Sequence, residues 1–119
     1  MTRLPLLTEI RDRTQFSQLL ETNPGKIIIK FGAEWCAPCK LIEKQVFEWI
    51  DKMPETIQCI VVDIDESFDV YAFLKTKKML NGIPAILCYN QGNTSYIPDD
   101  AVIGADKNKV NEFFQRCLE

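Results

Sequence analysis

The spacing of apolar residues changes several times along the chain, and each change marks a change of predicted element. Residues 26–33 form a short β-branched run, Lys-Ile-Ile-Ile-Lys-Phe-Gly-Ala, which predicts a strand buried on both faces. Residues 56–64 predict a second buried strand, and residues 83–89 a third that begins at a proline. A further strand is expected between 94 and 103, interrupted by Pro98 and two aspartates.

Helical spacing of apolar residues predicts a helix in each segment between or after these strands. The first helix spans 12–22, and the second follows the first strand and closes near Met53. Ser67 is the expected N-cap of a third helix, and the last helix begins near Asp106. After a possible N-terminal strand the order is α-β-α-β-α-β-β-α. It predicts an α/β fold with a right-handed parallel βαβ unit, a closing hairpin, and helices on both faces of a mixed sheet.

Length and charge narrow the classes of protein that fit this order. The chain has 119 residues, so one domain over 1–119 is expected. A net charge of −3 offers no basic surface for nucleic acid or an anionic membrane. No apolar stretch reaches the roughly 7–15 residues of a secretory signal or the roughly 20 of a membrane span. We therefore expect a cytoplasmic protein that binds neither nucleic acid nor membrane.

The chain contains five cysteines and no histidine, which limits its chemistry further. An odd count of cysteines argues against a disulfide-stapled extracellular scaffold. Without histidine, and with a single Cys-X-X-Cys pair, no metal site within one chain is expected, although a cluster shared between two chains stays open. Cys59 and Cys88 lie in predicted core strands and Cys117 on the apolar stripe of the last helix, so packing is the default role for these three.

The remaining two cysteines, Cys36 and Cys39, stand at a predicted junction between strand and helix. There the unpaired backbone N–H groups and the dipole of a helix N-terminus favour a thiolate. Pro38 suits the first turn because its missing N–H costs no hydrogen bond. The spacing brings both sulfurs within bridging reach, so the pair can exchange disulfides, Cys36 attacking and Cys39 resolving. Lys40 adds a nearby positive charge, whose effect is small if the side chain is exposed.

Residues 31–40, Phe-Gly-Ala-Glu-Trp-Cys-Ala-Pro-Cys-Lys, resemble the active-site signature of the thioredoxin family, and the element order is similar over nearly the whole chain. The resemblance implies a thioredoxin fold with a central mixed sheet of four to five strands. It also implies a protein-disulfide oxidoreductase that works through a mixed disulfide and needs no cofactor beyond the Cys36–Cys39 pair. The implied partners are protein disulfides and a reductase or small thiol that supplies electrons.

The resemblance also assigns roles to single residues. Cys36 matches the nucleophile, Cys39 the buried resolving cysteine, and Trp35 the aromatic residue beside the site. Pro84 matches a cis-proline that faces the disulfide, and the backbone of Ile83 would pair with a bound polypeptide. The other residues that the resemblance places at the site are Ala37 and Pro38 between the cysteines, and Gly82 and Gly104, which let a substrate backbone approach the sulfurs.

Beneath the cysteines the sequence departs from the family pattern. Lys30 stands where a buried aspartate is usual, Val61 where its lysine partner is usual, and Lys44 where a proline often kinks the helix. Lys30 has two interpretations. Its ammonium can favour a Cys39 thiolate, which would stabilise the reduced form and make the disulfide more oxidising. Alternatively its stem lines the strand and its ammonium reaches water or a carboxylate such as Glu34, Asp63 or Asp65.

The helix before Pro84 and the final hairpin each look longer than in a minimal member of the family, by about one turn's worth of residues. A basic cluster, Lys75, Lys77 and Lys78, precedes the loop that contains Pro84. The cluster can meet an acidic partner or a reductase, or it can simply end a helix, where cations suit the dipole.

An adaptor that holds partner proteins without redox turnover is the alternative function. Thioredoxin folds also serve as such adaptors, and the changes at Lys30 and Val61 would fit a lost activity. Both cysteines and the whole frame from Trp35 to Lys40 are intact, however, and a pure adaptor has no chemical need of two sulfurs. The sequence therefore favours the enzyme.

Overall fold

The computed structural model describes residues 3–119, and its helices and strands follow the predicted order. The possible N-terminal strand is reduced to one isolated parallel bridge between Leu7 and Ile60, so the sheet of the described chain has four strands. The strands are β1 (Lys26–Gly32), β2 (Ile57–Asp63), β3 (Ala85–Asn90) and β4 (Asp100–Ile103), and the helices are α1 (Arg13–Glu21), α2 (Ala37–Ile50), α3 (Phe68–Thr76) and α4 (Lys107–Cys117).

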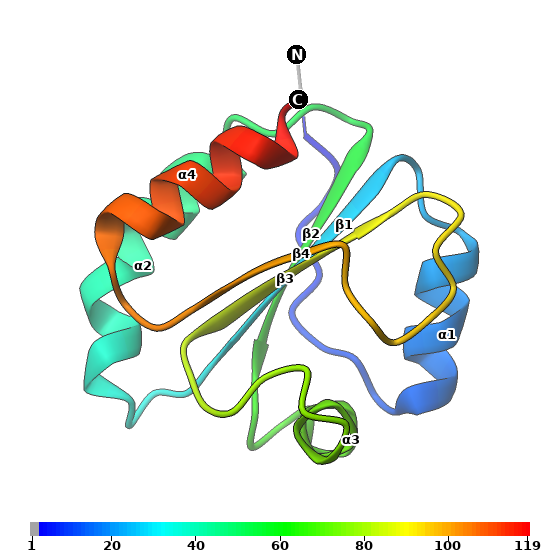
Figure 1. Ribbon diagram of the computed structural model, residues 1–119, viewed down its shortest axis with the longest axis horizontal. Helices are drawn as coiled ribbons and strands as arrows, with labels where there is room; N and C mark the ends of the chain where they lie inside the picture. Colours follow the sequence, from blue (N-terminus) through cyan, green and yellow to red (C-terminus); the bar gives the residue numbers. More distant parts are fainter. Residues whose placement is uncertain (1–2) are drawn as a thin grey trace.

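The sheet is mixed, with the order β2-β1-β3-β4. β1 and β2 are parallel, whereas β3 is antiparallel to both β1 and β4. Figure 1 shows α1 and α3 on one face of the sheet and α2 and α4 on the other. The predicted α/β fold, with helices on both faces of a central mixed sheet, is therefore confirmed.

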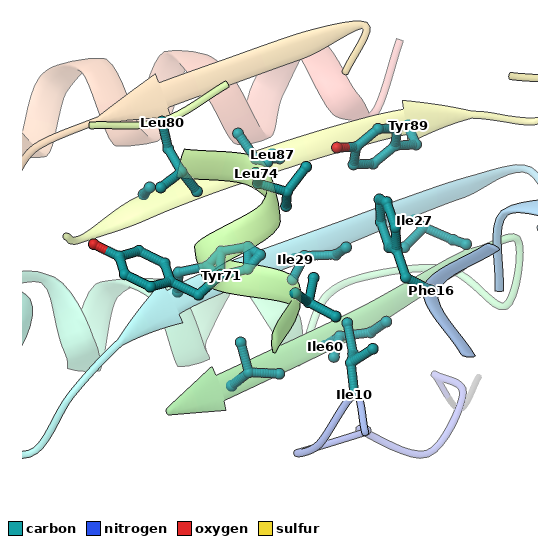
Figure 2. Packing of buried hydrophobic residues seen from close by; sticks show 14 of the residues in the cluster. Ile10, Phe16, Ile27, Ile29, Ile60, Tyr71, Leu74, Leu80, Leu87 and Tyr89 are labelled. Carbon is teal, nitrogen blue, oxygen red and sulfur yellow. The ribbon is translucent and has the colours of Figure 1, made fainter. Parts of the chain in front are cut away.

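The alternation of side chains along β1 divides the apolar residues between two cores. Ile27, Ile29 and Phe31 belong to the core under α1 and α3, most of which Figure 2 shows. Ile28 belongs to the second core, under α2 and α4. Lys30 follows Ile28 by two residues, so the strand directs this lysine toward α2.

Strand direction gathers four connecting segments at one edge of the sheet. β1 and β2 are parallel and end there, with Gly32 opposite Asp63. β3 runs the other way and begins at the same edge, with Ala85 opposite Phe31. β4 ends beside it, with Ile103 opposite Ala85. The loop before α2, the loop before α3, the segment before β3 and the segment after β4 therefore meet.

Ser67 stands at the N-cap position of α3, as predicted, but its hydroxyl does not cap the helix. The Ser67 Oγ instead accepts a hydrogen bond from the backbone N–H of Ile10 at 3.1 Å. The predicted N-cap position is therefore confirmed, but the hydroxyl makes no hydrogen bond to the helix. The hydroxyl satisfies a buried donor of the N-terminal segment, a long-range contact to which local sequence patterns are blind.

The C-terminus of α3 forms a Schellman motif with a lysine in place of glycine. The N–H of Met79 donates to the carbonyl of Leu74 at 2.9 Å, and the N–H of Lys78 to that of Lys75 at 3.0 Å. This pair of hydrogen bonds requires the residue before Met79 to be left-handed, and that residue, Lys78, has a φ of 64°. For a residue with a Cβ this conformation costs about 1 kcal/mol.

Lys78→Gly is expected to raise the free energy of unfolding by about 0.5–1 kcal/mol, because glycine adopts this conformation without steric cost. Urea denaturation measures the change as a shift of the midpoint. Lys77→Gly is the matched control, since Lys77 has a φ of −80° and glycine should destabilise there. A Lys78→Gly variant less stable than wild type contradicts the prediction.

Candidate active site

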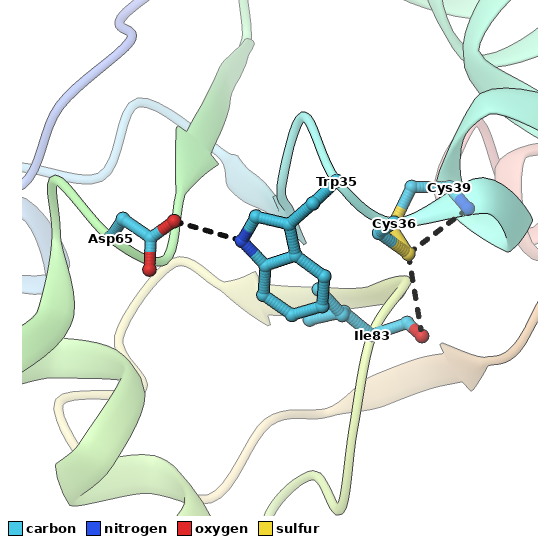
Figure 3. Close-up of a disulfide and its surroundings, with 5 residues drawn as sticks. All are labelled: Trp35, Cys36, Cys39, Asp65 and Ile83. Atoms are coloured by element: carbon cyan, nitrogen blue, oxygen red, sulfur yellow. Dashed lines mark hydrogen bonds between the residues drawn. A yellow bond between two sulfur atoms is a disulfide. The ribbon is translucent and has the colours of Figure 1, made fainter.

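Cys36 and Cys39 form a disulfide at the start of α2, with their Cα atoms 5.3 Å apart (Figure 3). Cys36 is the N-cap of the helix, and its Sγ accepts a hydrogen bond from the backbone N–H of Cys39 at 3.2 Å. Ala37 and Pro38 begin the first turn between them. An N–H that points at the Cys36 sulfur, at the positive end of the helix dipole, would also stabilise a thiolate there once the bond is reduced.

Trp35 is 67% exposed and lies beside the disulfide. Its indole Nε1 donates a hydrogen bond to the Asp65 Oδ2 at 2.9 Å, which Figure 3 shows. Asp65 is held in turn by its own N–H, which donates to the Asp63 Oδ1 at 2.8 Å. Sequence reasoning did not identify Asp65 as a partner of Trp35. The predicted βαβ unit could have indicated this contact. Asp65 follows β2 and Trp35 follows β1, and parallel strands end at the same edge of the sheet.

The segment before β3 also lies against the disulfide. The Ile83–Pro84 peptide bond is cis, and the Cys36 Sγ lies 3.9 Å from the carbonyl oxygen of Ile83. The N–H of Gly104 donates to the carbonyl of Pro84 at 2.8 Å, and Gly104 has a φ of 97° that favours glycine. A Cβ added at Gly82 would have no heavy atom within 4 Å, so open space lies beside this backbone.

Lys30 lies beneath the disulfide and is 5% exposed. A Cβ built on Gly32 would lie 3.4 Å from the Lys30 Nζ and 3.5 Å from the Cys39 Sγ, so the ammonium and the second sulfur flank the same point. Burial lowers the pKa of Lys30 from its usual value, and the negative charge of Glu43 opposes this effect. Sequence reasoning missed Glu43. Within residues 3–119 no carboxylate oxygen lies within 4.0 Å of this ammonium.

A cleft of about 270 Å³ opens between β1, β2 and α2, and it contains both Lys30 and Cys39. Val61 pairs with Lys30 across the strands and lines the same cleft, as expected for the position of the usual lysine partner. Lys40 is exposed at its outer side. Four carboxylates also line the cleft, those of Glu34, Glu43, Asp63 and Glu66.

The other three cysteines are free and buried, as the sequence predicted. Burial raises the pKa of Cys59 to about 12, so this thiol is protonated at neutral pH. A hydrogen bond to Cys88, together with burial, also raises the pKa of Cys117. The same hydrogen bond lowers the pKa of Cys88, so burial and not protonation separates this third thiol from the pair at α2.

Metal-ligand clusters and long apolar helices were the two remaining features of interest. Among residues 3–119, no three cysteine, aspartate or glutamate side chains are arranged to hold a metal ion. Within the same range, no helix has the length and apolar character needed to cross a membrane.

Comparison with known proteins shows what the chain is similar to. The family model described as Thioredoxin matches residues 8–116. The Thioredoxin of Ophiophagus hannah is 28% identical over 110 residues, which cover 92% of this chain and 96% of the relative. Thioredoxin 3 of Plasmodium falciparum is 29% identical over 113 residues, which cover 93% of this chain but 59% of the relative. The crystal structure of Malassezia sympodialis thioredoxin has a TM-score of 0.69 and 27% identity, over 95% of this chain and 93% of that one.

Proposed function

The chain belongs to the thioredoxin family and is a thiol–disulfide oxidoreductase. We propose that it exchanges electrons with protein disulfides, and that the exchange passes through a mixed disulfide on Cys36. The observation that carries the proposal is the sulfur of Cys36 at the N-cap of α2, bonded to Cys39 and facing the Ile83 backbone. No cofactor beyond this pair of sulfurs is part of the proposal.

In the first step, the reduced Cys36 thiolate attacks one sulfur of the substrate disulfide. A bond forms between the Cys36 Sγ and that sulfur, and the other substrate sulfur leaves as a thiolate that takes up a proton. The hydrogen bond from the N–H of Cys39 and the start of α2 support the attacking charge.

In the second step, the Cys39 thiolate attacks the Cys36 Sγ and releases the second substrate thiolate. The two electrons that the substrate has gained are those that Cys36 and Cys39 lose, so the protein ends in the disulfide state that the structure describes. Lys30 is the positioning residue of this step in our proposal. Its ammonium and the Cys39 Sγ each lie within 3.5 Å of the point where a Cβ on Gly32 would stand, and a positive charge there favours the thiolate.

The segment before β3 is the proposed binding site for the substrate backbone. The Ile83 peptide group lies next to the Cys36 sulfur, and an extended polypeptide can add to it as a short strand. The open space beside Gly82 and the left-handed Gly104 support this role, since neither glycine presents a side chain to the approaching chain. Trp35, held by Asp65, would cover the other side of the bound segment.

A reductase or a small thiol is the proposed electron donor that returns the pair to the dithiol. Three buried free thiols suit a reducing compartment, and the cytoplasm is the one that we propose.

Cys39→Ser is expected to accumulate mixed disulfides, because the substrate stays bonded to Cys36 when the resolving thiolate is missing. The variant is incubated with a protein mixture without reductant, and disulfide-linked species are counted by nonreducing electrophoresis before and after dithiothreitol. The Cys36→Ser/Cys39→Ser variant is the matched control and should trap nothing. Equal trapping by the double variant, or none by Cys39→Ser, contradicts the proposed mechanism.

A further inference from the structure

A groove of about 480 Å³ lies beside the proposed backbone-binding segment, at the edge of the sheet where the site is built. Most of its accessible lining is apolar: Leu80 is buried, Met79 is half-buried, and Ile103 is 42% exposed. Lys75 and Lys78 stand at its rim, and Asn81 completes the lining. Four of the lining residues, Lys78 to Asn81, belong to the segment between α3 and β3. Figure 1 shows the course of this segment.

The groove adjoins the proposed substrate path at two points. Asn81 lies two residues before Ile83, whose carbonyl is next to the Cys36 sulfur. Ile103 directly precedes Gly104, which is hydrogen-bonded to Pro84. An extended chain advances about 3.3 Å per residue, so a substrate chain paired with Ile83 brings a side chain about two or three positions from its cysteine to the groove.

The charge at the rim has one sign. Lys75 and Lys78 are exposed, and within residues 3–119 neither has a carboxylate oxygen within 4.0 Å. No acidic side chain lines the groove among the described residues. The opposite flank of the site carries Asp63 and Asp65 instead. The site therefore has an acidic side and a basic side, although the chain as a whole has a net charge of −3.

Lys78 holds its place at the rim in a left-handed conformation that glycine would adopt without cost. The Schellman motif at the end of α3 accounts for this conformation but not for the presence of lysine, since glycine would adopt it at lower cost. Lys77, its neighbour, is turned away from the groove, with its Nζ 5.5 Å from the centre of the Tyr96 ring and 5.9 Å from that of Phe73.

We infer that this groove selects substrates: it binds a large apolar side chain of the substrate polypeptide that is flanked by aspartate or glutamate. The apolar side chain occupies the space above Leu80 and beside Ile103, and the carboxylates meet Lys75 and Lys78. The inference rests on the proposed exchange at Cys36 and adds a preference for acidic over basic flanks to it.

The test uses synthetic peptides with one cysteine blocked as a mixed disulfide with nitrothiobenzoate, whose release is coloured. The first peptide has leucine two positions from the cysteine on each side, followed outward by aspartate and glutamate. The second has two lysines in place of the acids, and the third has serine in place of leucine. The second-order rate constant with the reduced protein is measured by stopped flow for each, at low and high salt.

At low salt the acidic peptide is expected to react about threefold to tenfold faster than the basic one, because two exposed ion pairs contribute a free energy of about that size. High salt should remove the difference. The serine peptide should be slower than the leucine peptide at either salt concentration. Lys78→Glu should reduce or reverse the preference, and Lys78→Gly, which relieves the strained backbone, should reduce it. Lys77→Glu makes the same change of charge one residue away and should retain the preference.

Equal rate constants for the acidic and basic peptides overturn the inference while the proposed function stands. An equal effect of Lys77→Glu and Lys78→Glu also overturns it, because the preference would then come from overall charge. If none of the peptides reacts with the reduced protein, the proposed exchange at Cys36 is itself contradicted.

Discussion

Cys36→Ser is expected to lower the rate of protein-disulfide reduction by at least about a thousandfold, since a serine hydroxyl ionises far less readily than a thiol and is a poor nucleophile toward sulfur. The Cys36 sulfur faces the Ile83 backbone, whereas Cys39 is 3% exposed and its sulfur lies beside Gly32. The loss should therefore come from the first step of exchange. The measurement is the initial rate on a folded protein disulfide, with glutathione as the electron source.

Cys59→Ala is the control for that loss. Cys59 lies on β2 in the core under α2 and α4, and burial raises the pKa of its thiol to about 12. Its removal should cost stability but leave the rate per folded molecule within about twofold of wild type. A Cys36→Ser variant that still turns over would contradict the assignment of the nucleophile. Wild-type protein that binds protein disulfides without reducing them would favour the adaptor that the sequence left open.

Most of the fold follows from local patterns in the sequence. The β-branched run of β1 and the apolar stripe of α4 are long enough for the spacing of apolar residues to identify one as a strand and the other as a helix. The order of the elements along the chain then limits the sheet to a few topologies. Ser67 shows where this reasoning stops. Its position before α3 is local and was predicted, but its bond to the N–H of Ile10 joins residues 57 positions apart.

The residues of the candidate site also fall into two groups, those that local sequence predicts and those that only the packing of distant elements brings together. Cys36, Cys39 and Pro38 are neighbours in sequence, and a spacing rule is enough to place them at a helix start. Asp65 and Glu43 come to the site from a different strand end and a different helical turn. Their roles depend on which edges and faces meet in three dimensions. The sequence marked Lys30 as unusual, but its distance from Cys39 depends on the packing of α2 over β1.

Lys30→Met is the second change with a large expected effect, because it removes a buried charge without removing the bulk of the side chain. In our proposal the ammonium of Lys30 stabilises negative charge on Cys39 in the reduced protein, and so favours the dithiol over the disulfide. Without it the disulfide is favoured, and the reduction potential should fall, becoming more negative, by about 30 mV, equivalent to about 1.4 kcal/mol. Equilibration with glutathione at neutral pH measures the potential.

The same variant should be more stable than wild type, by about 1 kcal/mol at neutral pH, because a buried ammonium without a close carboxylate costs free energy. Burial lowers the pKa of Lys30 from 10.5 in the folded protein, so the folded state binds fewer protons than the unfolded chain as the pH approaches that value. The penalty is thus present at neutral pH and relieved as the pH rises toward 10.5, and the advantage of Lys30→Met should shrink in parallel.

Lys44→Met separates the effect of the buried charge from that of the substitution. Lys44 lies on α2 and is exposed, so the same change there should leave the potential unaltered and the stability within about 0.5 kcal/mol of wild type. An unchanged or less negative potential for Lys30→Met would contradict its role beside Cys39, even if the gain in stability appeared. A gain in stability with a more negative potential would mean that the protein retains a costly buried charge because that charge sets the redox balance of its active site.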